Sequence, residues 1–342
     1  MADGIDLSLI WILIIGFGLM MYVVMDGFDL GIGILFIFVR NTHDRDIMVN
    51  TVAPVWDGNE TWLVLGGAGL MAAFPLAYSV LLSALYIPII LMLMGLILRG
   101  VAFEFRFKAS PTHRPLWDIA FAGGSYAAGF FQGAALGAFI NGFAVVGPSY
   151  EGGALDWLSP FSVFTGVGVI VSYALLGSTW LTMKTVGDLQ GLMISYARRI
   201  VPLLLIGIGI VSLWTPLAHH EIAGRWFAVP NIFWFAPVPV LVIATSVQLL
   251  RLLTGGSGGK IPRAEPFLLA LLMLFLGYSG LAISLWPHII PPGISFRDAA
   301  APAASQAFAV VGAVVIIPFI LAYTGWAYYV FRGKVTGTEG YH

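Results

Sequence analysis

The chain has 342 residues, of which 59% are hydrophobic and only 10% are Asp, Glu, Lys or Arg, and its net charge is −1. Soluble domains carry about 45–50% apolar and about 25% charged residues, so this composition excludes a soluble enzyme, a nucleic-acid-binding protein and a disordered chain. The apolar residues occur in long continuous runs, which indicates membrane-spanning helices rather than the short alternating segments of a membrane barrel.

Uncharged stretches predict the spans in chain order. The first, 7–39, contains two aspartates and otherwise predicts one long helix. The next, 61–98, is too long for one span, and Phe74-Pro75 divides it because proline cannot continue the helical hydrogen bonding. Further spans are predicted within 119–150, 157–183, 200–220, 226–250, 266–296 and 299–331. The result is a polytopic all-α protein with nine transmembrane helices, in which 1–342 form a single integral membrane domain.

Basic residues predict the orientation. With the N-terminus outside, all 16 Lys and Arg residues except Arg225 and Arg297 fall in cytoplasmic segments. The positive-inside rule describes such a bias. We therefore expect a periplasmic N-terminus and a cytoplasmic C-terminus. An incorrect number of spans would scramble the distribution, so it also supports nine crossings.

Residues that usually hold metals are scarce. The chain has no cysteine, which excludes disulfides, iron–sulfur clusters and thiolate-bound haem. A haem inside a helical bundle usually needs a histidine from a helix, but the histidines fall in loops or at span ends. They are His43, His113, His219, His220, His288 and His342. We expect neither a metal site nor a buried haem in this chain.

Glycines four residues apart in the predicted fourth span, at Gly129, Gly133 and Gly137, line one helix face and let another backbone approach closely. Helix packing within the chain is the favoured interpretation. A close contact with another subunit or a cofactor is the alternative.

Acidic residues near the membrane carry the strongest functional signal. Asp26 and Asp29 are three residues apart in the first span and share a helix face. Asp57 and Glu60 have the same spacing where the second span opens, and Arg99 is predicted to end the third span on the same side. Three helix ends would therefore bring four acids and one arginine to one membrane level.

Such a cluster has two interpretations. Intramembrane carboxylates usually face a cavity or a partner, and a carboxyl between a desolvating interior and an arginine can relay protons. The cluster would then be a cytoplasmic proton entry path. Alternatively, the acids cap helix starts, where the helix dipole stabilises them, and pair with Arg99 structurally. The two are evenly balanced for Asp57 and Glu60, and the structural one is favoured for Asp26 and Asp29.

At these residues the chain resembles a known family, subunit II of cytochrome bd-type quinol oxidases. The matching stretches occur in the family's order from the first span to the last. They are Met25-Asp-Gly-Phe-Asp-Leu-Gly31, Trp56-Asp-Gly-Asn-Glu-Thr-Trp62, Gly177-Ser-Thr-Trp-Leu-Thr-Met-Lys184 with Gly187-Asp-Leu-Gln190, and Pro318-Phe-Ile-Leu-Ala-Tyr-Thr-Gly-Trp326. The sequence also suggests the cyanide-insensitive branch of this family.

The resemblance implies a terminal oxidase of the bacterial inner membrane that oxidises quinol and reduces dioxygen to water. It implies two four-helix bundles plus one peripheral helix, packed against a subunit I that carries haem b and haem d. This chain would scaffold subunit I and contribute a cytoplasmic proton-uptake path, without catalytic residues or covalently bound cofactors of its own. The resemblance also allows a structural quinone here and small single-helix subunits in the complex, besides the surrounding lipid.

The resemblance further assigns roles to single residues. In the family the aspartate of the Trp-Asp-Gly-Asn motif, here Asp57, lies on the proton-uptake route. Many members have Gln in place of Glu60, and the extra acid would either add a relay step or change the local charge balance. Supporting or structural roles are expected for Asp26, Asp29, Trp56, Asn59, Arg99 and Glu104.

A proton-coupled secondary transporter is the alternative function. It too would show paired intramembrane acids and glycine-interrupted helices, often within inverted repeats. The chain has no clear internal repeat, and its acids crowd toward one membrane face rather than the midplane. Both observations count against a transporter.

Overall fold

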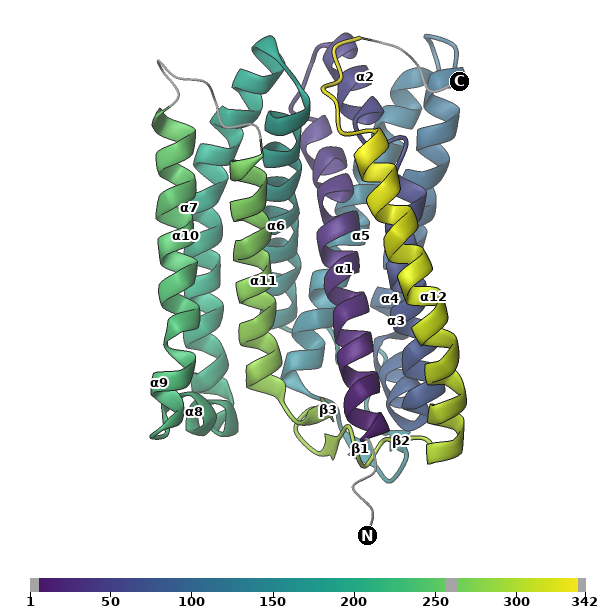
Figure 1. Ribbon diagram of the computed structural model, residues 1–342, viewed down its shortest axis with the longest axis vertical. Coiled ribbons are helices and arrows are strands. Elements are labelled where there is room, and N and C mark those ends of the chain that lie inside the picture. The colour runs from purple at the N-terminus through teal and green to yellow at the C-terminus, as the bar shows by residue number, and fades with distance from the viewer. Residues whose placement is uncertain (1–5, 256–263, 338–342) are drawn as a thin grey trace.

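The computed structural model describes residues 6–255 and 264–337, and nearly all of them belong to helices that run side by side (Figure 1). The long helices are α1 (Leu7–Phe36), α3 (Trp56–Ala73), α4 (Pro75–Lys108), α5 (Arg114–Asn141), α6 (Pro160–Lys184), α7 (Gly187–Ala218), α10 (Pro237–Thr254), α11 (Glu265–Leu285) and α12 (Ala303–Val330). Seven of these helices are long and apolar enough to cross a membrane, when α10 is counted together with the short helix that precedes it. The other two are α3 and α5. The prediction of an all-α membrane protein with many spans is confirmed.

Short elements lie at the two ends of the bundle (Figure 1). At the end of the bundle where α1 starts, two antiparallel hairpins lie near α1 and two short helices lie beside α7 and α10, whereas α2 lies at the opposite end, near the end of α12. These elements are α2 (Thr42–Asn50), β1 (Val145–Val146), β2 (Ser149–Tyr150), α8 (His220–Phe227), α9 (Asn231–Phe235), β3 (His288–Ile290) and β4 (Ile294–Ser295).

Contacts between distant segments fix the helix directions. Near the start of α1, the Trp11 indole donates a hydrogen bond to the Gln306 carbonyl at 3.1 Å, which brings the start of α12 beside it. At the same end, the Ala301 amide donates to the Ala73 carbonyl at 2.8 Å. Helix α3 therefore ends where α1 and α12 begin, and runs antiparallel to α1.

Helices α1 and α6 approach each other closely at two glycines. A Cβ atom on Gly31 would lie 1.9 Å from the Tyr173 carbonyl oxygen, and one on Gly177 would lie 2.5 Å from the Gly31 carbonyl carbon. Only glycine allows these backbones to meet. Beside this contact, Phe28 stacks on Trp180 with ring centroids 4.2 Å apart. Two of the family-like stretches in the sequence thus pack directly against each other.

The glycine stripe of α5 also serves packing within the chain. A Cβ on Gly133 would lie 2.5 Å from the Thr165 carbonyl oxygen, and one on Gly137 would lie 2.1 Å from the Thr165 hydroxyl. Both contacts are with α6. The favoured interpretation of these glycines is therefore confirmed.

Two helix ends differ from the predictions. Helix α1 ends at Phe36, three residues before the end of the predicted run. The prediction that Arg99 ends its helix is wrong, because α4 continues to Lys108. After Gly100 the sequence has no glycine or proline until Pro111, and the residue before a proline disfavours the helical conformation, so the helix stops just ahead of it.

Alanine substitutions at glycines would test the contact between α1 and α6. Gly177→Ala should lower the thermal unfolding temperature of the purified protein and its yield, because overpacking typically costs about 1–3 kcal/mol and the clash here is with backbone. Gly168→Ala in the same helix is the control, since nothing lies within 4 Å of the added Cβ. Equal unfolding temperatures for the two variants would contradict the close approach.

Candidate functional site

The candidate site is built around Arg99, a residue within α4 whose side chain is completely buried. Its Nη1 atom donates to Asp26 Oδ1 of α1 at 2.7 Å, and its Nη2 atom donates to Glu60 Oε1 of α3. One guanidinium therefore joins three helices, α1, α3 and α4. Burying this charge is tolerable because two carboxylates bind its two terminal nitrogens.

Asp29 is also completely buried, but it contacts Asn59 instead of the arginine. The Asn59 Nδ2 atom donates to Asp29 Oδ2 at 2.8 Å and to the Met25 carbonyl at 3.2 Å. The Asn59 Oδ1 atom accepts a hydrogen bond from the Tyr328 hydroxyl of α12 at 2.9 Å. Asn59 thus connects α1, α3 and α12 and fixes the direction of the Asp29 carboxyl.

The two acids at the start of α3 differ in burial. The buried side of this helix is marked by Asn59 and Trp62, and Asp57 points away from it and is exposed. Glu60 follows Asn59 directly, so it lies at the edge of the buried side with 29% of its side chain exposed. The carboxyls therefore become steadily more buried from Asp57 through Glu60 to Asp26.

Trp56 helps to hold the start of α3 against α4. Its ring stacks on Phe103 with centroids 5.1 Å apart and planes 8° from parallel. It also packs over Gly100, where an added Cβ would lie 3.3 Å from the indole. This supports the two helices immediately beside the contact between Glu60 and Arg99.

Glu104 lies outside the cluster. Five residues beyond Arg99 in a helix correspond to a rotation of about 140° from its face, and the Glu104 side chain is 63% exposed and lies 3.9 Å from Lys108. Arg106, seven residues beyond Arg99, returns to the buried face and is itself completely buried.

Arg106 is the centre of a second ionic network that sequence reasoning missed. It donates to Asp118 Oδ1 of α5 at 2.6 Å and to Asp46 Oδ1 of α2 at 2.7 Å. Arg45 donates to the other oxygen of Asp118 at 2.8 Å, and Arg114 binds Asp46. The only sequence signal for this network was the seven-residue spacing between Arg99 and Arg106, because its aspartates follow no recognisable motif.

The histidines lie where the sequence indicates, at or near the ends of elements or in loops, except that His342 is outside the described residues. Within residues 6–255 and 264–337, no three His, Asp or Glu side chains are grouped so that they could hold a metal ion.

What the Arg99 cluster offers chemically is a series of carboxyls leading from the protein surface to a permanent buried cation.

Comparisons with known proteins agree with this architecture. A sequence model described as cytochrome bd terminal oxidase subunit II matches residues 7–331. The chain is 30% identical over 375 residues to cytochrome bd-I ubiquinol oxidase subunit 2 of Escherichia coli K12, covering 98% of this chain and 97% of that protein. It is 26% identical over 339 residues to cytochrome bd ubiquinol oxidase subunit 2 of Bacillus subtilis 168, covering 96% and 97%.

A solved structure shares the fold. A chain of the bd oxidase from Geobacillus thermodenitrificans aligns with a TM-score of 0.77 at 17% identity, covering 96% of this chain and 99% of that one. The sequence match extends over nearly the whole length, from α1 to the residue after α12. The chain therefore belongs to the cytochrome bd terminal oxidase subunit II family.

Proposed function

We propose that this chain scaffolds the haem-bearing subunit I of a quinol oxidase and delivers cytoplasmic protons to it. Membership of the family makes the chain a subunit of a terminal quinol oxidase, a complex with haem cofactors and a partner subunit 1. The observation that carries the proton-delivery role is the graded burial of the carboxyls that lead to Arg99.

The proposed route begins at Asp57, whose carboxylate is exposed and has no ion pair among the described residues. Glu60 is one helical turn further on, so the two side chains share a face. Glu60 can exchange protons with solvent on its exposed side while Arg99 holds its other oxygen. The positive charge of Arg99 keeps an arriving proton mobile, because it favours the ionised form of each neighbouring carboxyl.

Asp26, Asp29, Asn59 and Trp56 serve this route as supports. Asp26 balances the charge of Arg99, and Asn59 holds Asp29 in place. Glu104 is separated from the route, and we assign it a surface role with Lys108. Any catalytic residue then belongs to the partner subunit.

We further propose that the chain crosses the bacterial inner membrane nine times as a single domain, with α3 and α5 as the two additional crossings. Supporting this, α3 starts beside the second half of α1 and ends beside the start of α12. Helix α5 starts near the end of α4. The residue that follows its other end, Gly142, lies against Pro291 in the turn between β3 and β4, at the opposite end of the bundle. Two four-helix bundles with α12 as the peripheral helix fit this arrangement.

The positive-inside distribution supports a periplasmic N-terminus and a cytoplasmic C-terminus. Two of the basic residues that contribute to it, Lys260 and Arg263, lie outside the described residues. On this orientation the exposed Asp57 faces the cytoplasm, which is the side from which an oxidase that builds a potential must draw its substrate protons. We retain membership of the cyanide-insensitive branch as a prediction.

Haem b and haem d are proposed to lie in subunit I, where they supply electron transfer and oxygen reduction. A structural quinone in this chain and small single-helix subunits remain part of the proposal, with lipid around the complex. The rival transporter function has no support among the relatives, since they are named as oxidase subunits.

Replacing Asp57 tests the proton-delivery role. Asp57→Asn should leave the complex assembled, with its haem absorption intact, and should lower oxygen consumption by about tenfold or more, because loss of a proton-transfer group typically costs about 10²–10⁴ in rate when that step limits turnover. Glu104→Gln is the matched control, an exposed acid at the same end of the bundle but outside the route. Normal turnover by an assembled Asp57→Asn complex would contradict the relay.

Replacing Arg99 tests the scaffold role. Arg99→Gln should abolish assembly, because breaking a buried ion pair typically costs about 3–5 kcal/mol and Asp26 would be left without a counter-charge. The double change Arg99→Gln with Asp26→Asn should recover part of the assembly, measured as haem-containing complex after purification. Arg251→Gln, at the exposed end of α10, is the control for loss of a basic residue. A stable complex from the single Arg99 variant would count against the pairing.

A further inference from the structure

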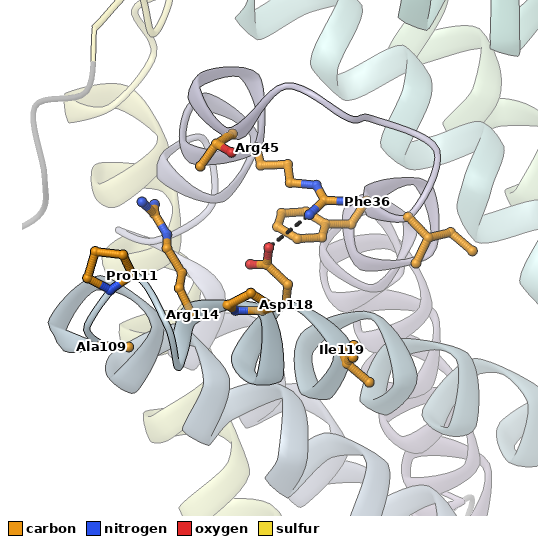
Figure 2. Close-up of a pocket in the computed structure, with 10 residues that line it drawn as sticks. Phe36, Arg45, Ala109, Pro111, Arg114, Asp118 and Ile119 are labelled. Carbon is orange, nitrogen blue, oxygen red and sulfur yellow. Dashed lines mark hydrogen bonds and ion pairs between the residues drawn. The ribbon is translucent and has the colours of Figure 1, made fainter.

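A pocket of about 490 Å³ lies at the end of the bundle that holds α2 (Figure 2). None of the residues that line it belongs to the Arg99 cluster. It is formed where α1 ends, α2 begins, and the loop between α4 and α5 leads into α5. Its lining includes two arginines, Arg45 and Arg114, and one aspartate, Asp118. Nothing in the proposed oxidase function uses this pocket.

The charges around the pocket do not balance. The ionic network behind it contains three arginines and two aspartates, so one positive charge remains in excess. Arg106 is completely buried and binds both aspartates. Arg45 and Arg114 therefore share carboxylates that are already engaged, which leaves them able to bind a further anion.

Arg114 in particular keeps unused donor capacity. Its Nη2 atom binds Asp46 and its Nε atom is removed from solvent, so Nη1 is the nitrogen of this partly exposed side chain that is left to bind a ligand. In Figure 2 the Arg114 guanidinium lies beside Pro111 and the Arg45 guanidinium lies over the Phe36 ring, with Asp118 between them. A phosphate accepts several charge-assisted hydrogen bonds from arginine, which makes it a suitable ligand for this site.

One wall of the pocket is apolar and open. Ile37 and Ile119, which both line it, are 50% and 70% exposed. Ile119 belongs to α5, five residues beyond Arg114 and further along the bundle. A free phosphate would make no favourable contact with this apolar wall, whereas the acyl chain of a lipid would cover it.

The depth of the pocket agrees with a lipid. It lies where the long helices α1 and α4 end and α5 begins, and in the proposed topology this end of the bundle is at the cytoplasmic surface of the membrane, where lipid phosphates lie. Basic pockets between transmembrane helices at the cytoplasmic side are suited to anionic lipid headgroups. We propose that this pocket binds the phosphate of an anionic phospholipid, with Arg114 and Arg45 as the ligands and Ile37 and Ile119 against an acyl chain.

The experiment uses the purified two-subunit oxidase, stripped of lipid and titrated with phosphatidylglycerol, with bound lipid counted by native mass spectrometry. The unchanged complex should hold one phosphatidylglycerol at this site. Arg114→Gln should weaken the binding by at least about fivefold, since each basic residue near the surface contributes about 1 kcal/mol. Lys108→Gln is the matched control, because it removes the same charge nearby from a side chain that is 79% exposed and outside the pocket.

A second variant keeps every ion pair of the network. Ala109→Glu adds a carboxylate to the pocket lining and should weaken phosphatidylglycerol binding by the same factor. If the Arg114→Gln complex does not assemble, the Ala109→Glu result alone tests the proposal. Equal binding by all variants would overturn the proposal, as would an unchanged complex that binds no phosphatidylglycerol because its partner subunit fills the pocket. Displacement by millimolar inorganic phosphate would show a free-phosphate site instead, and equal retention of zwitterionic phosphatidylcholine would refute the need for an anionic lipid.

Discussion

The guanidinium of Arg99 is taken wholly out of water, and an isolated charge in that position would cost several kcal/mol. Its neutralisation by Asp26 and Glu60 is therefore a constraint on the whole bundle, because α1, α3 and α4 must all reach the same point. The same constraint makes the two carboxylates differ in their exposure to solvent. One acid is sealed beside the cation and the other remains partly exposed, so the same contact that joins the helices gives the interior an acidic link to the surface.

The surrounding packing holds this link in place. Gly31 and Gly177 let α1 and α6 meet backbone to backbone, which fixes the helix that carries Asp26 and Asp29. Helix α12, although it has few buried residues, is fastened at its far end by the Tyr328 contact with Asn59 and by Lys184, whose amino group donates to the carbonyls of Phe331 and Gly333. The family-like stretches of α1, α3 and α6 thus form one connected set of contacts, and α12 joins this set just beyond the fourth stretch, through Tyr328 and Phe331.

The sequence predicted the helices, because uncharged runs are long. It placed Asp26, Asp29, Asp57 and Glu60 at one level with Arg99, and the structure brings Asp26 and Glu60 to the arginine but leaves Asp29 on Asn59 and Asp57 exposed. It did not predict that Glu104 points away from the Arg99 cluster. That orientation arises because α4 continues as a helix beyond Arg99, and the prediction had ended the helix there. The contact of Tyr328 with Asn59 joins residues 269 positions apart, and no local pattern encodes it. The network around Arg106 was missed for the same reason, because its partners come from α2 and α5.

The most direct measurement is a high-resolution cryo-electron microscopy map of the two-subunit oxidase in a lipid bilayer, with ordered water resolved. The account predicts Arg99 between Asp26 and Glu60, and a continuous series of waters and polar side chains from Asp57 past Glu60 to the haem-bearing subunit. A map in which the cluster is dry, closed on the side of Glu60 and separated from subunit I by apolar side chains would contradict it, and would leave the acids with a structural role alone.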